Sequence, residues 1–355
     1  MSVSMKLRPS AILLSAVGLL SLSAVASAQP QNPPVAPAPA EPDAAPATTV
    51  DALVVRAARP GPAFWKVTRG ASTVWVMGAP SALPKGLPWK QDELKAHLRN
   101  ARVLIVGTGG YTFNIADIFT LIFSGKQFRS DQPLSATLPP DLLARYEAAR
   151  SGLRAPERVN ELKPGFAGVI LSSSFQRSLN MDFGQPERTI TRDAFLRVHS
   201  ERVGRSDVVD VIKIFSEMSP AMARTCVEDA VRQVEAGRDR MLEAARGWTT
   251  GDLRVAISAE RGLDNCIERD PRVAAESARN MTEVTNAILE ALNKPGKAVA
   301  VVDLRPLLTK GGIIERLMAQ PGVKVITPDV PGLDDEITAE AAQPETDPMP
   351  TGPAI

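Results

Sequence analysis

The side chains that could do chemistry in this chain follow two apolar runs that we predict to be strands. Ser81 lies three residues after Gly78, which ends the run 74–77, and Asp303 directly follows the run 297–302. A serine hydroxyl on a loop that a rigid strand positions can act as a nucleophile. A carboxylate at a strand end can hold a hard cation, such as calcium or magnesium, together with backbone carbonyls.

Both residues also have a simpler interpretation. A triad of Ser81 and His97 with an acid lacks the strained strand-to-helix turn that exposes a nucleophilic serine. For Asp303 we favour capping of a neighbouring turn or pairing with Arg305. His97 lies on the polar side of a predicted helix at 89–100, so we expect it to be exposed to solvent.

The two histidines show no metal-ligand spacing with each other. His199 belongs to an arginine-rich segment, 191–203, which we predict to be helical and exposed. Cys226 and Cys266 are the only cysteines, and an even pair in an exported chain predicts a disulfide. Two buried thiols are the alternative. We do not expect a zinc site, because the two cysteines lack the nearby histidine partners that it would need.

The N-terminus has the organisation of a secretory signal. Lys6 and Arg8 precede a nearly uncharged stretch at 11–25, and small residues end the segment at Ala28. This order predicts a signal peptide, residues 1–28, that is cleaved after Ala28. An uncleaved anchor is the alternative, but the apolar stretch is shorter than the ~20 residues that a span requires. We therefore expect a periplasmic or secreted protein with no transmembrane span after cleavage.

The rest of the chain divides by composition into three regions. Residues 29–60 are rich in proline and alanine and predict an extended linker. Residues 61–327 have the composition of a folded domain, and residues 328–355 form an acidic, proline-rich tail that we predict to be disordered. The formal net charge is +1 and Lys and Arg are not clustered, so we expect no nucleic-acid binding.

Strand and helix patterns alternate in mixed order along the body. Strands are predicted at 63–67 and 73–77, which form a hairpin, and at 103–106, 208–214, 297–302 and 323–326. Helices are predicted at 89–100, 115–123, 140–149, 165–179, 191–203, 221–245, 272–293 and 312–319, with Thr250 placed to cap another. The order predicts an α/β (α+β) fold, a mixed β-sheet with an N-terminal hairpin flanked by many helices.

Several short segments occur in an order and spacing that match one known family. They are Phe64-Trp65-Lys66-Val67, 73–78, Leu83-Pro84, 101–107, Trp248 with Gly251-Asp252, Arg279-Asn280, and 300–312. Together they resemble the TraB/GumN family, also called TraB/PrgY/GumN and related to the Tiki proteases. The resemblance covers roughly residues 60–327, nearly the whole body, and implies an EreA/ChaN-like architecture.

The resemblance also implies where a metal-dependent hydrolytic site would lie. In the family, two Gly-x-x-His motifs and the acidic end of a strand are thought to form it. Here the first motif keeps Gly78 but has Ser81 at the histidine position, and Gly107 stands at the acidic position. The second motif has Asp303 at the glycine position and Pro306 at the histidine position.

These departures fall on the residues that would bind the metal. A hydrolytic centre needs about three protein ligands and an open position, whereas serine is a poor ligand and proline supplies none. We therefore predict a pseudoenzyme with no catalytic residue, no metal and no cofactor, which binds a peptide, a polysaccharide or an envelope protein. The alternatives are an active metal-dependent hydrolase or protease with substituted ligands, and a purely structural envelope protein.

Four further residues of the matching segments receive structural roles in this interpretation. Arg279 and Asn280 either line the cleft of the family or pack and cap across the helices, and we favour the second role. Trp248 and Asp252 look architectural.

Overall fold

The computed structural model describes residues 49–107, 110–112, 128–154, 157–183, 198–259 and 262–330. The predicted signal peptide, the predicted helix at 115–123, most of the linker and the tail from residue 331 lie outside the described residues. The body begins earlier than residue 61. Leu53 and Val54 are buried in the main core, Val50 donates its N–H to the carbonyl of Leu308, and the short helix η1 (Asp51–Leu53) lies here.

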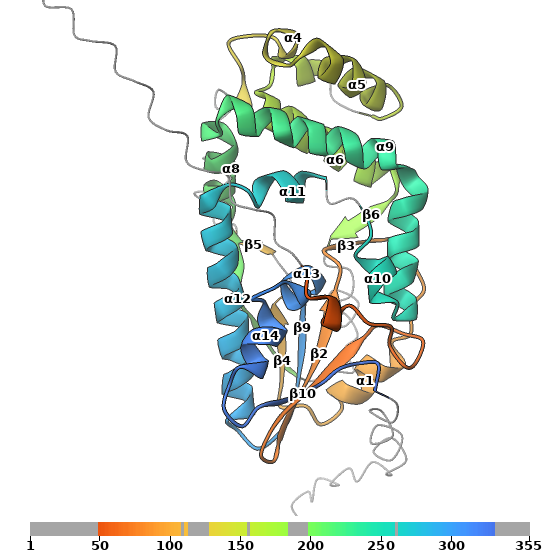
Figure 1. Ribbon diagram of the computed structural model, residues 1–355, viewed down its shortest axis with the longest axis vertical. Helices are drawn as coiled ribbons and strands as arrows, with labels where there is room; N and C mark the ends of the chain where they lie inside the picture. The colour runs from red at the N-terminus through yellow and green to blue at the C-terminus, as the bar shows by residue number, and fades with distance from the viewer. Residues whose placement is uncertain are drawn as a thin grey trace, which may run out of the picture. The chain divides into compact units, whose positions relative to one another are not determined.

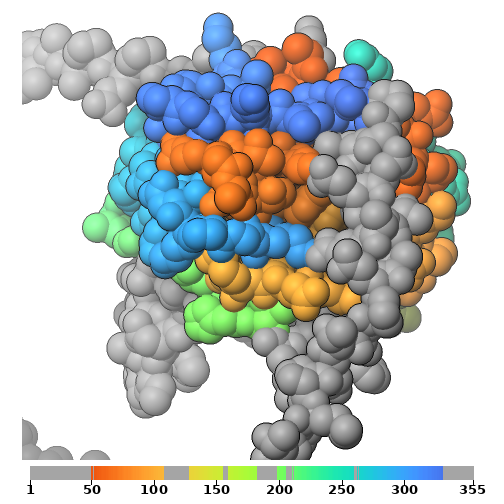
Figure 2. Space-filling model, turned by 90° about the horizontal axis from the view of Figure 1, so that it is seen from below, coloured from red at the N-terminus to blue at the C-terminus, as the bar shows by residue number. Residues whose placement is uncertain are grey.

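A six-stranded mixed sheet forms the centre of the fold (Figure 1). Its strands are, in spatial order, β10 (Lys324–Ile326), β1 (Phe64–Arg69), β2 (Ser72–Ala79), β9 (Gly296–Asp303), β4 (Val103–Gly107) and β7 (His199–Arg202). Strand β1 pairs antiparallel with β2 and β10, whereas β2, β9, β4 and β7 are all parallel. Figure 2 shows these segments side by side in the same order. The predicted α/β class and N-terminal hairpin are confirmed.

The central strands are apolar because helices cover the sheet. In β9, the residues from Ala298 to Val302 are all buried, the continuous pattern of a parallel strand inside a protein. The covering helices that contact the sheet are α1 (Asp92–Leu98), α12 (Pro271–Leu292), α13 (Leu304–Leu308) and α14 (Ile313–Met318). Two small sheets pair β3 (Ala82–Pro84) with β6 (Met181–Phe183), and β5 (Gly110–Thr112) with β8 (Arg205–Asp207).

A second hydrophobic core lies among helices outside the sheet. It joins α4 (Leu134–Thr137), α5 (Pro140–Ser151), η2 (Glu157–Glu161), α6 (Pro164–Ser178) and the first part of α9 (Pro220–Thr250). Helix α9 is kinked at Gly237, whose φ of +86° is open to glycine and costly for other residues. Beyond the kink α9 turns toward the sheet and meets α10 (Leu253–Ala256), as Figure 1 shows.

Three local predictions are wrong. Residues 208–214 belong to a helix, α8 (Val208–Glu217), because the buried Ile212 and Phe215 follow a helical spacing that a short run of β-branched residues hides. Residues 199–202 form β7 rather than a helix; the strand is exposed along its length and pairs parallel with β4 through its main chain. Thr250 ends α9, and Asp252 caps α10 by accepting from the N–H of Val255 at 3.2 Å.

Among the described helices, none is long and apolar enough to cross a lipid bilayer.

Candidate functional site

The motif positions of the sequence meet at one edge of the sheet. Strand β9 lies between β2 and β4, and all three are parallel, so their carboxyl ends lie side by side. In the register, Gly78 and Gly107 both pair with Val302, and Ala79 pairs with Asp303. Segments that are far apart in sequence therefore converge where open α/β sheets usually bind their ligands.

Gly78 is held between a helix and a buried indole. A Cβ at this position would lie 2.6 Å from the Cδ1 atom of Leu304, so α13 could not pack as closely against any other residue. The Nε1 of Trp248 donates a hydrogen bond of 2.8 Å to the carbonyl oxygen of Gly78. Trp248 is fully buried and lies near the end of α9, so it fixes that helix to the end of β2.

Gly107 is packed against α12. A Cβ at Gly107 would lie 2.7 Å from the Cγ2 atom of Val284 and 3.2 Å from the Cγ1 atom of Val302. Val284 is itself buried. The space into which an acidic side chain would extend is therefore occupied by valine methyl groups.

Asp303 ends β9 and stands at the N-cap position of α13, with Pro306 in the helix that follows. The Asp303 side chain makes no capping hydrogen bond to α13, so it does not cap this helix, and pairing with Arg305 stays a prediction. Arg305 donates from its Nη2 to the carbonyls of Ile257 at 2.8 Å and Ala259 at 3.1 Å.

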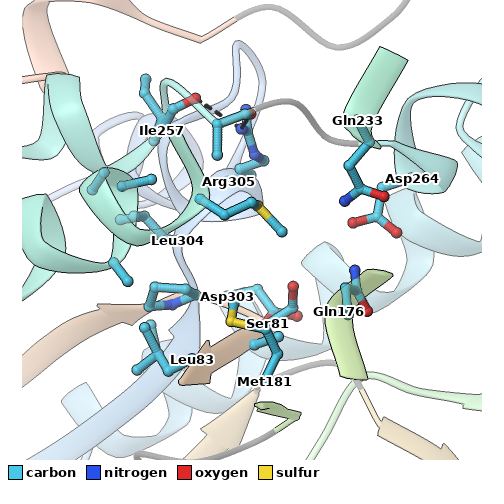
Figure 3. Close-up of a pocket in the computed structure, with 18 of the residues that line it drawn as sticks. Ser81, Leu83, Gln176, Met181, Gln233, Ile257, Asp264, Asp303, Leu304 and Arg305 are labelled. Carbon is cyan, nitrogen blue, oxygen red and sulfur yellow. Dashed lines mark hydrogen bonds between the residues drawn. The ribbon is translucent and has the colours of Figure 1, made fainter. Parts of the chain in front are cut away.

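A cavity of about 300 Å³ opens beside these strand ends (Figure 3). Ser81 and Asp303 contribute to its wall, and Ser81 is exposed. Arg305 of α13 also lines it, and the other polar lining residues come from helices outside the sheet: Gln176 of α6, Gln233 of α9, Asp264 of α11 (Leu263–Ile267), and Glu268 directly after α11. The two parts of the kinked α9 both reach the cavity, with Gln233 before Gly237 and Met241 after it.

A second cavity, of about 170 Å³, lies on the other side of the α13 start. Asp303 and Pro306 line both cavities. Gly107 and Asn280 line only the second one, whereas Arg279 is exposed and lines neither. Asp252 lies 3.8 Å from Arg56 as an ion pair and caps α10, away from both cavities.

His97 is buried, contrary to the sequence prediction. Its side chain is 2% exposed, and its ring stacks on Trp75 with centroids 3.9 Å apart. Its Nε2 lies 3.8 Å from Oε1 of Glu93. The exposed neighbours Lys95 and Arg99 hid this burial in the sequence. His97 lines neither cavity, so the structure does not assemble it with Ser81, and His199 is exposed on β7.

Cys226 and Cys266 form the predicted disulfide, which joins α9 to α11. Helix α11 carries Asp264, so the cross-link fixes part of the cavity wall. Sequence analysis missed the residues of this wall, namely Gln176, Gln233, Asp264 and Glu268. For Gln176 the sequence held one signal: it lies four residues after Ser172 in a predicted helix, so the two polar side chains share a face of that helix.

The residues at the motif positions do not fit a hydrolytic metal centre. Ser81 is a poor ligand, Gly107 and Pro306 have no donor side chain, and Asp303 alone supplies a carboxylate. Within the part of the chain that the structure describes, no three His, Cys, Asp or Glu side chains are grouped so that they could hold a metal ion.

The mixed sheet, with the carboxyl ends of three parallel strands at one edge, places the chain among α/β proteins. Comparison with known families identifies the family. The model of the TraB/PrgY/gumN family matches residues 63–325, and the chain belongs to this family. The search of curated proteins and the search of solved structures each found no match.

Proposed function

We propose that this protein is an exported, catalytically inactive member of its family that binds a ligand in the larger cavity. The observation that carries the proposal is the packing of Val284 and Val302 against Gly107. A strand end that has only lost its acidic metal ligand could regain it through one substitution at Gly107. Here Val284 of the neighbouring helix also fills the space that an acidic side chain would need. This arrangement is that of a site rebuilt around an apolar contact.

Ligand binding is supported by what remains at the strand ends. The larger cavity combines carboxylate, amide and hydroxyl groups with aliphatic side chains, the mixture found in sites that orient a small ligand. Its lining includes residues of β2, β3, α6, β6, α9, α10, α11, β9 and α13, so the fold brings together segments from most of the body to form it. A protein with a purely structural role would not need such a cavity.

Metal content and hydrolysis test the catalytic part of the proposal. The purified chain is incubated with zinc, cobalt or manganese, dialysed, and analysed for bound metal, then assayed against peptide and ester substrates. We expect neither a stoichiometric metal nor turnover. A retained metal, with a hydrolytic activity that Ser81→Ala and Asp303→Ala abolish, would show that the protein is an enzyme.

Fractionation tests the export part. Expression of the tagged full-length chain in a bacterial host should give a periplasmic or secreted product whose N-terminus is Gln29, as mass spectrometry of the N-terminal peptide would show. A product that stays in the cytoplasm with Met1 intact would contradict export.

A further inference from the structure

The larger cavity has two unlike walls. Aliphatic side chains form one, including Leu83, Ile257 and Leu304. The amides of Gln176 and Gln233 belong to the other, and Figure 3 shows them on the opposite side of the cavity from Ile257 and Leu304. The described lining residues include no aromatic side chain, so the cavity lacks the flat platform on which a sugar ring would stack.

The charged side chains of the described lining already have partners within the protein. Asp264, Glu268, Asp303 and Arg305 each take part in a hydrogen-bonding or electrostatic interaction. Arg305 also donates to two backbone carbonyls. A charged ligand would lose its hydration in the cavity and would have to compete with these partners. The neutral amides are therefore the groups that remain to recognise a ligand.

Gln233 offers a hydrogen-bond donor to the cavity. The residue is 2% exposed, and its Oε1 accepts a hydrogen bond of 2.7 Å from the hydroxyl of Ser172. Its amide nitrogen has no hydrogen-bond partner among the described residues, and Figure 3 shows this nitrogen on the cavity side. A buried donor is costly to leave without a partner, so it favours a ligand with an acceptor, such as a carbonyl oxygen.

Gln176 places a second amide in the same wall. It follows Ser172 by four residues in α6, so the two side chains share a face of that helix. Because the Ser172 hydroxyl binds Gln233, the two amides are near neighbours. Gln176 is half-buried, and its amide has no hydrogen-bond partner in the part of the chain that the structure describes. It therefore offers the cavity both a donor and an acceptor.

A primary carboxamide matches this pair of amides. Its N–H and C=O groups can pair with the C=O and N–H groups of Gln176, and its carbonyl oxygen has a second lone pair that accepts from Gln233. An alcohol oxygen is a single atom and cannot pair with both ends of the Gln176 amide. A ketone supplies only the acceptor.

We infer that the larger cavity binds a small, neutral carboxamide with an aliphatic chain. The amide group pairs with Gln176 and Gln233, and the chain packs on the wall of Leu83, Ile257 and Leu304. This inference rests on the proposed function, because it names the ligand of that same cavity.

Five probes that share a pentyl chain and differ in their head group separate these contributions. Isothermal titration calorimetry of the purified, folded chain compares hexanamide with heptan-2-one, hexan-1-ol, hexanoate and hexylamine. We expect hexanamide to bind most tightly. The ketone and the alcohol should each bind about tenfold more weakly, since each loses at least one hydrogen bond. The two ions should bind more weakly still, because each must be desolvated.

Two variants test the amides separately. Gln176→Met keeps the length of the side chain, and should weaken hexanamide about tenfold while leaving heptan-2-one nearly unchanged. Gln233→Glu keeps the oxygen that accepts from Ser172 but loses the donor, and should weaken both probes about tenfold. Because Gln233 is buried, circular dichroism first checks that its variant folds, and Gln176→Met tests the assignment independently of it.

Two further variants locate the binding. Gln91→Met is the matched control for Gln176→Met, because Gln91 is also half-buried, makes no capping hydrogen bond to α1 and does not line the cavity. This control should bind hexanamide like the unchanged chain. Ser81→Trp, at the exposed edge of the cavity, should abolish binding of every probe.

The outcomes separate this inference from the proposed function. Equal affinities for hexanamide and heptan-2-one, tighter binding of the alcohol or of either ion, no binding of any probe, or a Gln176→Met variant that binds hexanamide normally would each overturn the carboxamide assignment. If one of the ions bound most tightly and Ser81→Trp abolished that binding, ligand binding in the cavity would stand with a different ligand. A retained metal with hydrolytic turnover would instead overturn the proposed function.

Discussion

The indole nitrogen of Trp248 donates a hydrogen bond of 2.8 Å to the carbonyl oxygen of Gly78, and this contact joins two segments 170 residues apart. It connects the end of α9, whose earlier turns line the larger cavity, to the strand end at which the first motif begins. The geometry of the cavity therefore depends on a side chain that does not line it.

Replacing that donor should destabilise the fold. Trp248→Phe keeps an aromatic ring but leaves the Gly78 carbonyl buried without its partner, which should lower the free energy of unfolding by about 1–3 kcal/mol. Urea denaturation measures the loss. Trp89→Phe is the matched control, since the Trp89 ring lies 5.3 Å from that of Trp248 but is only half-buried. An equal loss in both variants would mean that ring volume, and not the hydrogen bond, matters.

The contact between Gly107 and Val284 should behave as an overpacked site when a side chain is added. Gly107→Ala brings a methyl group to within 2.7 Å of Val284 and should lower the free energy of unfolding by about 1–3 kcal/mol. Val284→Ala in the same chain should recover part of that loss, which a double-mutant cycle detects as a coupling energy.

Gly152→Ala is the control for the Gly107 prediction, because a Cβ there meets nothing within 4 Å. It should leave the unfolding midpoint nearly unchanged. Strictly additive effects of Gly107→Ala and Val284→Ala would contradict the packing that we describe, and with it the main support for a rebuilt metal position.

Acid should weaken the start of α12 through Asp270. Burial raises the pKa of this carboxyl, but hydrogen bonds from the guanidinium and backbone N–H of Arg272, together with its charge, outweigh burial and hold the pKa below 3.8. Asp270 also caps α12, and its Oδ2 accepts from Arg272 at 2.9 Å. Because the folded pKa is depressed, this stabilisation is present above pH 3.8 and is lost as the pH falls through the folded value.

The pH dependence is measured with Asp270→Asn, which keeps a capping side chain and removes the charge. The difference in unfolding free energy between the unchanged chain and this variant should be largest near neutral pH and shrink as the pH falls below 4. A difference that stayed constant between pH 7 and pH 3 would mean that the ion pair with Arg272 contributes nothing to stability.

The disulfide should stabilise both the fold and the cavity wall. Cys226 and Cys266 are 40 residues apart, so the chain-entropy model gives about 4 kcal/mol for the closed loop. Replacing both with alanine should lower the unfolding free energy by a comparable amount. A reducing agent should have the same effect on the unchanged chain and no effect on the double variant. Unaltered stability on reduction would contradict a structural role for the cross-link.

The strands that form the site were predictable because their residues are apolar and buried. The runs that become β2, β4 and β9 are continuous, and Gly78, Gly107 and Asp303 directly after them indicated where they end. Their adjacency was implied only by the family resemblance, since pairing of distant strands leaves no local pattern. The helix at 208–217 was missed because Val and Ile suit a strand as well as a buried helix face.

The polar wall of the cavity could not be predicted. Gln233 and Met241 reach the same cavity only because α9 bends at Gly237. A single glycine in a long helical pattern does not by itself predict a kink. His97 illustrates the opposite error. Its exposed neighbours indicated a polar helix face, whereas its ring fills a space between Trp75 and Phe64 in the core.

The central claim is that the strand ends at Ser81, Gly107 and Pro306 can no longer hold a catalytic ion. Metal analysis of the purified chain tests this claim most directly. After saturation with zinc, cobalt or manganese and exhaustive dialysis, we expect no metal above the level found for a chain denatured and treated in parallel. A stoichiometric ion that survives dialysis, and is lost in Asp303→Ala, would contradict the account.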